Sequence, residues 1–271
     1  MSPKSSLIPA RPARPAVPWV GGKRNLADTI ARLIASTPHD LYAEPFVGAG
    51  GVFLRRPFKA PAEVINDINR DVVTLFRVLQ RHYLAFVETL RWQLTTRADF
   101  ERLAATDPAT LTDLERSARF VYLQRAGFGG RVAGRTFGVS YGPARFDVTK
   151  LVPLLEAVHE RLARVTIECL SWSDFIDRYD RPETLFYCDP PYQGSEHYYG
   201  KGLWSADDFA RLADRLRQVK GRWLVSLNDT PEIRTAFKGS RMRPVRTTYS
   251  VHHNGGVPGG AKELLISGPK P

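Results

Sequence analysis

The stretch that decides the fold is Thr184-Leu185-Phe186-Tyr187-Cys188-Asp189-Pro190-Pro191-Tyr192. Its first five residues have the length and composition of a buried strand. The two prolines then lock φ and remove two backbone donors, so the segment after Asp189 cannot pair as a strand. A carboxylate, two free carbonyls and an aromatic ring therefore follow the strand. Taken alone, the motif is equally compatible with a rigid turn in which Asp189 is a cap and Tyr192 packs in the core.

A second strand and loop lie nearer the start of the chain. Residues 41–46 predict a strand that runs into the glycine-rich loop 47–51 and an apolar helix start. Glycines at such a turn let a ligand approach the backbone closely. The loop lacks the G-x-G-x-x-G spacing of dinucleotide-binding proteins, which counts against a dinucleotide-dependent oxidoreductase.

The strand predicted at 63–66 ends in Asp67, which follows the glycine loop by about 20 positions. An acidic residue at that place can hold a ribose diol, and a helix N-cap is the alternative for Asp67. Glycine loop and acid together favour a cofactor that contains a nucleoside.

Strands and helices alternate along both ends of the chain, on either side of a mainly helical segment. This alternation predicts an α/β fold with a doubly wound sheet, interrupted by an inserted subdomain at 71–158. The sheet domain would comprise 18–70 and 159–271, preceded by a flexible basic arm at 1–17. Further strands are expected at 165–170, 184–188 and 222–227, one long helix at 71–94, and a terminal antiparallel pair from 243–252 and 262–266.

The charge of the chain favours a polyanionic partner. Lysine and arginine total 39 against 28 acidic residues, a net charge of +11. Nucleic acid fits this excess first and a membrane surface second. No stretch approaches the roughly 18 uncharged apolar residues of a membrane span, so we expect an intracellular protein. Cys169 and Cys188 lie in apolar runs without ligand spacing, which predicts buried thiols and no metal site.

A glycine-rich segment at 127–142 interleaves arginines with aromatic residues. This composition suits a hairpin that tracks phosphates and stacks on bases. Arg125, Arg131, Arg135 and Tyr141 are therefore candidate DNA contacts. A solvated loop without a ligand is the alternative.

The remaining candidates share one predicted edge, because ligands of open α/β sheets bind beyond the carboxyl ends of the strands. The carboxylate of Asp189 and the carbonyl of Pro190 could each accept one N–H of an exocyclic amine, which draws the nitrogen toward sp³ geometry. Tyr192 would stack on the base, a contact worth roughly 1–3 kcal/mol. Such a pocket requires that the base be flipped out of a duplex.

The sequence resembles the Dam-type (D12 class) DNA adenine-N6 methyltransferases from about residue 18 to residue 266. Four motifs carry the resemblance, in this order: Trp19-Val20-Gly21-Gly22-Lys23, Glu44-Pro45-Phe46-Val47-Gly48-Ala49-Gly50-Gly51, Asn66-Asp67-Ile68-Asn69 and Asp189-Pro190-Pro191-Tyr192. This order is similar to the family's alpha arrangement. The resemblance implies an S-adenosylmethionine-dependent methyltransferase sheet whose insertion is the target-recognition subdomain.

The resemblance also implies the cofactor, the substrate and the site. S-adenosylmethionine would donate a methyl group to the N6 amino group of a flipped-out adenine in double-stranded DNA. Asp189, Pro190 and Tyr192 would be catalytic. The residues expected to bind the cofactor are Trp19, Gly22, Lys23, Phe46, Gly48, Gly50, Asp67, Phe175 and Asp189. We expect a bacterial or phage-encoded cytoplasmic monomer, with a cognate restriction endonuclease as a candidate partner.

One segment departs from the family. Phe128-Gly129-Gly130-Arg131 stands where the family often has F-N-G-x-x-R, so no target sequence such as GATC carries over. The open alternatives are a cytosine-N4 methyltransferase, an RNA adenine-N6 methyltransferase and a catalytically silent DNA-binding relative. Aspartate rather than serine at position 189 favours adenine, and a silent binder has no need of Asp189.

Overall fold

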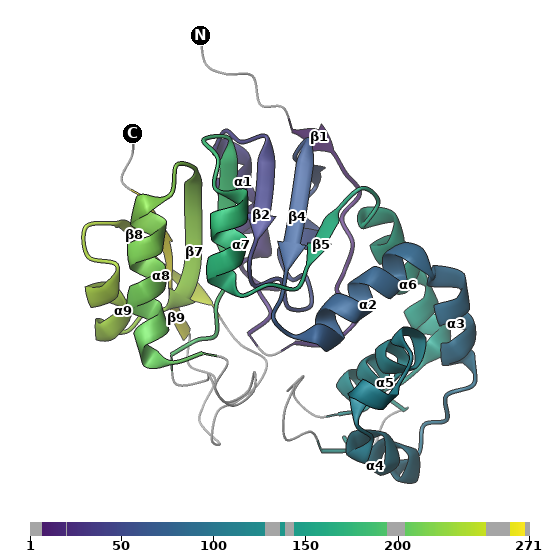
Figure 1. Ribbon diagram of the computed structural model, residues 1–271. Coiled ribbons are helices and arrows are strands. Elements are labelled where there is room, and N and C mark those ends of the chain that lie inside the picture. Colours follow the sequence, from purple (N-terminus) through teal and green to yellow (C-terminus); the bar gives the residue numbers. More distant parts are fainter. Residues whose placement is uncertain are drawn as a thin grey trace.

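The computed structural model describes residues 7–19, 21–127, 136–138, 144–193, 204–247 and 261–268 (Figure 1). Its strands form one large sheet in the order β5-β4-β2-β6-β7-β9-β8, and β1 pairs with β3. The strands are β1 (Ile8–Pro9), β2 (Leu41–Glu44), β3 (Phe58–Lys59), β4 (Ala62–Asn66), β5 (Thr166–Glu168), β6 (Thr184–Cys188), β7 (Arg222–Asn228), β8 (Arg241–Thr247) and β9 (Ala261–Ser267).

The pairing of these strands confirms the predicted doubly wound sheet. Strands β5, β4, β2, β6 and β7 are parallel, and β9 runs antiparallel to both β7 and β8. The chain builds outward from β2 through β4 to β5, then returns to the other side of β2 with β6 and β7. The strand order thus reverses between β2 and β6, which is where open α/β sheets bind their ligands.

Helices cover both faces of the sheet. The helices α7 (Trp172–Tyr179), α8 (Ala206–Gln218) and α9 (Pro231–Ala236) pack their apolar residues against one face, and Figure 1 shows α7 and α8 in front of it. The helix α1 (Ala27–Ser36) and the short 3₁₀ turn η1 (Phe53–Arg55) pack against the other face. The α9 helix was not expected from the sequence.

The helical segment lies beside the β5 edge of the sheet (Figure 1). It contains α2 (Arg70–Arg81), α3 (Tyr83–Arg91), α4 (Arg97–Ala105), η2 (Pro108–Thr110), α5 (Asp113–Ala126) and α6 (Val148–Arg161). The single helix predicted over 71–94 is divided, because His82 leaves helical geometry with φ −128° and ψ 30°. The apolar periodicity continues across that break, which is why the sequence does not reveal it.

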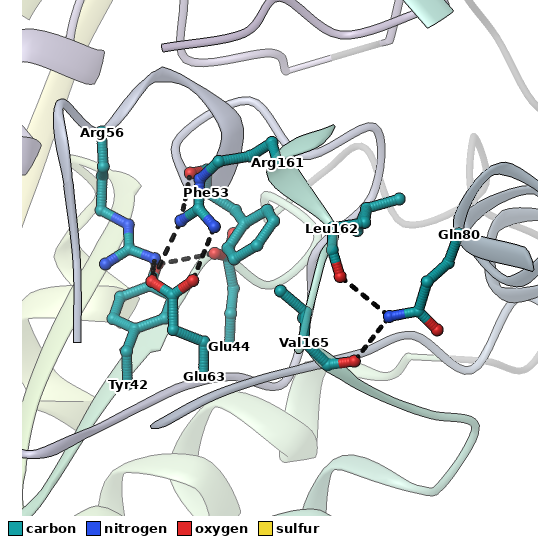
Figure 2. Close-up of polar contacts among 9 residues, drawn as sticks. All are labelled: Tyr42, Glu44, Phe53, Arg56, Glu63, Gln80, Arg161, Leu162 and Val165. Atoms are coloured by element: carbon teal, nitrogen blue, oxygen red, sulfur yellow. Dashed lines mark hydrogen bonds and ion pairs between the residues drawn. The ribbon is translucent and has the colours of Figure 1, made fainter. Parts of the chain in front are cut away.

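A buried cluster of charges joins this segment to the sheet (Figure 2). Glu63 of β4 accepts hydrogen bonds from Arg56, which follows η1, at 2.5 Å and from Arg161 of α6 at 2.6 Å. The Arg56 guanidinium also lies 3.6 Å from the centroid of the Tyr42 ring. A carboxylate and two guanidinium groups thus join α6 to the β4 region, which lies almost 100 residues earlier in the chain.

The N-terminal segment corrects the expectation of a flexible arm. Ala13 and its neighbours Ala16 and Val17 are buried. The Ala13 N–H donates to the carbonyl of Leu54 at 2.8 Å, and β1 pairs with β3. Small side chains and satisfied backbone donors let residues 7–17 pack along the sheet domain. Residues 1–6 lie outside the described part of the chain.

The two cysteines differ in their surroundings. Cys188 is buried in β6 as expected, whereas Cys169 is exposed, because the edge strand β5 ends one residue earlier. Across the described helices, none has the length and hydropathy needed to span a membrane.

Candidate active site

The loops that follow β2, β4 and β6 meet at one edge of the sheet. The parallel register pairs Ala43 with Phe186 and Ala43 with Val64, so the carboxyl ends of these strands are level. Gly48, Asp67 and Asp189 follow those three ends. The structure therefore brings together the glycine loop, the acidic turn and the Asp-Pro-Pro-Tyr motif, as the sequence predicts.

Asp189 is held through one of its carboxylate oxygens. Lys23 Nζ lies 2.5 Å from Oδ1, and the Ser226 hydroxyl donates to the same atom at 3.0 Å. Burial raises the pKa of Asp189, and the charge and hydrogen bond of Lys23 oppose that rise. The Lys23 ammonium also lies 4.6 Å from the centroid of the Tyr192 ring. Lys23 thus links the two ends of the motif.

The residue after the motif is clamped to the end of β7. The Gln193 N–H donates to Asn228 Oδ1 at 3.2 Å, and Asn228 Nδ2 donates to the Gln193 carbonyl at 3.2 Å. The Thr230 hydroxyl donates to Gln193 Oε1 at 2.5 Å. Because the prolines cannot pair as a strand, these side chains supply the contacts that fix the loop.

Asp67 ties the glycine loop to the turn after β4. Its Oδ2 accepts the Gly48 N–H and its Oδ1 accepts the Asn69 N–H, both at 2.8 Å. Burial raises the pKa of Asp67 to about 6, and the backbone hydrogen bonds oppose the rise. The N-cap of α2 is Asn69, so the helix-cap alternative for Asp67 is wrong.

The glycine loop needs its glycines for geometric reasons. Gly48 and Gly50 have φ of 50° and 77°, in the region that favours glycine. A Cβ atom on Gly48 would lie 2.7 Å from Nε1 of Trp19, and one on Gly50 would lie 2.9 Å from Cγ of Leu54. Trp19 therefore packs directly on the glycine loop.

The other residues expected to contact the cofactor lie in different surroundings, and some of them are exposed whereas others are buried. Phe46 packs edge-on against Trp204 with ring centroids 5.4 Å apart, and Gly22 is exposed beside Trp19. Phe175 has 0% of its surface exposed and its ring packs against Tyr179. The Phe175 side chain is thus a core residue in this structure and offers no surface to a ligand.

The candidate DNA contacts fall mostly outside the described residues. Arg131, Arg135 and Tyr141 all lie there. Arg125 is half-buried, and its Nε donates to the carbonyl of Ala16 at 2.9 Å. Its guanidinium therefore helps to hold the N-terminal segment.

Sequence reasoning missed four polar residues beside the motif. Tyr187, Ser226, Glu44 and Glu263 are all buried. Burial raises the pKa of Glu44 to about 8, and its Oε2 accepts the Tyr42 hydroxyl at 2.6 Å. Burial also raises the pKa of Glu263, whereas the nearby Lys23 lowers it. The signal in the sequence was a polar residue within an otherwise apolar strand. It lies near the carboxyl end of the strand for Glu44, Tyr187 and Ser226, and near the amino end for Glu263.

The carboxylates of this site are not grouped like metal ligands. Within the ranges that the structure describes, no set of three or more His, Cys, Asp or Glu residues is arranged to hold a metal ion. The arrangement instead suits hydrogen-bond acceptance and positioning next to a loop that a ligand can approach.

Comparison with known proteins identifies relatives along almost the whole chain. The DNA adenine methylase of Haemophilus influenzae is 28% identical, over 97% of this chain and 96% of the relative. That of Vibrio cholerae is 30% identical over 91% and 93%, and that of Escherichia coli is 27% identical over 91% and 92%. Residues 19–251 match the family described as D12 class N6 adenine-specific DNA methyltransferase.

This match includes the packed Trp19, the glycine loop, the Asp67 turn and the Asp-Pro-Pro-Tyr motif. The chain therefore belongs to the D12 class of N6 adenine-specific DNA methyltransferases.

Proposed function

We propose that this protein transfers a methyl group from S-adenosylmethionine to the N6 amino group of a flipped-out adenine in double-stranded DNA. The observation that carries the proposal is the hydrogen bonding of the Asp189 carboxylate. The hydrogen bonds that described residues make to its side chain fall on Oδ1. Its Oδ2 is thus left to accept an N–H group, at the sheet edge that also holds the glycine loop.

The motif would position the amino group for reaction. Asp189 Oδ2 and the Pro190 carbonyl would each accept one N–H, and Tyr192 would stack on the base with the Lys23 ammonium beside its ring. As the N6 nitrogen forms its bond to the methyl carbon, the carbon–sulfur bond of the donor would break and the sulfur would leave as a neutral thioether. The N6 nitrogen would lose one proton in the reaction, and Asp189 Oδ2 would accept it. Positioning of this kind accounts for much of the rate enhancement in displacement reactions.

The residues around the glycine loop fit the donor. Bound S-adenosylmethionine supplies an electrophilic methyl group. Gly48 and Gly50 let the loop turn closely under Trp19 and Leu54, and Trp19 and Phe46 would offer aromatic contacts to the donor beside this loop. Asp67 orients the loop by accepting the N–H groups of Gly48 and Asn69, and its carboxylate would accept from a ribose hydroxyl.

The helical insertion at 71–158 is proposed to recognise the DNA. Arg131, Arg135 and Tyr141 would contact the duplex, and the net charge of +11 supports a polyanionic substrate. A monomeric state, a cytoplasmic location and a cognate restriction endonuclease remain predictions.

The test is methyl transfer from labelled S-adenosylmethionine to duplex DNA by the wild-type protein and by Asp189→Ala. We expect N6-methyladenine with the wild type and a fall of about 10²–10⁴-fold in kcat with the variant. Cofactor binding, measured by calorimetry, should be largely retained, because the other residues expected to bind the cofactor are unchanged. Asp214→Ala, which removes a carboxylate that is 68% exposed on α8, should behave as the wild type.

Two results would contradict the proposal. Wild-type activity in Asp189→Ala would remove the carboxylate from the reaction. N4-methylcytosine in place of N6-methyladenine would reassign the acceptor base. Mapping methylated positions in the DNA of an expressing host would reveal the recognised sequence in the same experiment.

A further inference from the structure

A buried chain of hydroxyl groups ends on Asp189. The register of β6 with β7 pairs Cys188 with Val225, so the next two positions, Asp189 and Ser226, are neighbours across the strands. Tyr187 lies two residues before Asp189 and therefore points to the same face of the sheet. The Tyr187 hydroxyl lies 2.8 Å from Ser226 Oγ, which lies 3.0 Å from Asp189 Oδ1.

The direction of these hydrogen bonds follows from the number of protons. A serine hydroxyl has one proton, and Ser226 donates it to the carboxylate, which can only accept. Tyr187 must therefore donate to Ser226. Burial raises the pKa of Tyr187 well above its usual range, so this hydroxyl keeps its proton at any working pH. Both side chains have 0% exposure, so bulk solvent does not compete for these hydrogen bonds.

We propose that Tyr187 and Ser226 are positioning residues that, together with Lys23, pin Oδ1 of Asp189 and so aim Oδ2 at the amino group of the substrate. This inference rests on the proposed function. Lys23 alone is a point charge that either carboxylate oxygen can satisfy, so it does not fix the rotation of the side chain. The hydroxyl of Ser226 on the neighbouring strand β7 is a directional donor, and it does fix the rotation of the Asp189 side chain.

If Tyr187 and Ser226 position Asp189, removal of their hydroxyl groups changes the titration of Asp189, which a loss of packing alone would not do. A hydrogen bond to the ionised form of a carboxyl lowers its pKa. Removing the Ser226 hydroxyl should therefore raise the pKa of Asp189 and move the acidic limb of the pH profile of kcat to higher pH. Among the described residues, the charged and titratable groups that interact with Asp189 are Lys23, Glu44, Tyr187, Cys188, Tyr192 and Glu263, and none of them is altered by this change.

The experiment compares Ser226→Ala, Tyr187→Phe and the double variant with the wild type. We expect kcat to fall by about tenfold or more in Ser226→Ala, the value of one lost hydrogen bond to a charged group. Tyr187→Phe should cause a smaller fall, because Tyr187 acts only through Ser226. The double variant should then equal Ser226→Ala. The KM for DNA and the Kd for S-adenosylmethionine should stay within about twofold of wild type in all three.

The matched control is Tyr179→Phe, which also removes one tyrosine hydroxyl that donates to a partner, Glu168, at 2.6 Å. It should leave kcat and the acidic limb unchanged. If Ser226→Ala fails to fold, Tyr187→Phe decides the question, since it removes a single oxygen atom.

Unchanged kcat and an unchanged acidic limb in Tyr187→Phe and Ser226→Ala would overturn the inference, as would additive effects in the double variant. A loss of thermal stability without a change in kcat would assign the pair to packing and overturn it equally. Failure of the proposed function has a different signature, because then the wild type itself would form no N6-methyladenine.

Discussion

Gly48 combines two constraints at one position. Its φ of 50° is unfavourable for any residue with a Cβ atom, and the space that a Cβ would fill is occupied by the Trp19 indole. The first constraint concerns the backbone alone. The second concerns the surface that is proposed to hold the cofactor.

These constraints can be separated by two glycine substitutions. Gly48→Ala should cost roughly 1–2 kcal/mol of folding free energy from backbone strain and should also displace Trp19. We expect it to weaken S-adenosylmethionine binding by tenfold or more and to change tryptophan fluorescence. Gly239 has φ of 88° with no atom within 4 Å of its Cβ position, so Gly239→Ala should show only the strain. Equal cofactor affinities in both variants would contradict the expectation.

The role in cofactor binding that the family resemblance implies for Phe175 does not fit its place in this structure. The family resemblance made it a candidate, but it lies on the side of α7 that packs on the sheet. Its neighbour Asp174 accepts from Ser171 at the start of the helix instead. The sequence does not reveal which side of so short a helix faces the core.

At the scale of elements, the cluster of Arg56, Glu63 and Arg161 couples the helical segment to the sheet (Figure 2). Close to it, Gln80 of α2 donates to the carbonyls of Leu162 and Val165 at 2.9 and 2.8 Å. The first contact joins α6 to β4, and the second joins α2 to the turn between α6 and β5. The insertion is therefore anchored at its two ends.

Removing the charge of Glu63 should be costly. Glu63→Gln leaves two buried guanidinium groups without a carboxylate, and breaking a buried ion pair in this way costs about 3–5 kcal/mol. Urea unfolding measures the loss. The control is Glu88→Gln, whose pair with Arg91 is 55–60% exposed and worth at most about 1 kcal/mol. Similar losses in both variants would show that the cluster does not anchor the insertion.

For the molecule as a whole, the buried carboxyl groups make stability depend on pH. Burial raises the pKa of Glu44 from 4.5 to about 8. Between these values the folded protein keeps a proton that the unfolded chain has released, so stability declines as pH rises. The slope is about 1.4 kcal/mol per pH unit for one such group. Asp67, raised from 3.8 to about 6, contributes in the same direction at lower pH.

Glu44→Gln should remove the part of this slope that belongs to Glu44. The variant keeps an oxygen that can accept the Tyr42 hydroxyl, but it has no proton to lose. Denaturant unfolding of the ligand-free protein at pH 5, 6, 7 and 8 should show a steeper decline for the wild type than for the variant. Parallel curves would contradict a buried, protonated Glu44.

The sequence by itself determined the features that local chemistry specifies. Apolar runs ended by glycine, proline or acid marked the strands of the parallel sheet, and the alternation of strands with helices specified its doubly wound class. The edge shared by Gly48, Asp67 and Asp189 followed, because the carboxyl ends of parallel strands lie together. These signals depend on residues that are neighbours in the chain.

Only the tertiary structure decided how the motif is held. The bonds of Ser226 to Asp189 and of Asn228 to Gln193 join positions more than 30 residues apart, and they depend on the register of β6 with β7. The packing of residues 7–17 depends in the same way on carbonyls at Leu54 and Pro57. Burial, pKa and hydrogen-bond partners arise from such distant contacts, and for that reason residue patterns alone could not supply them.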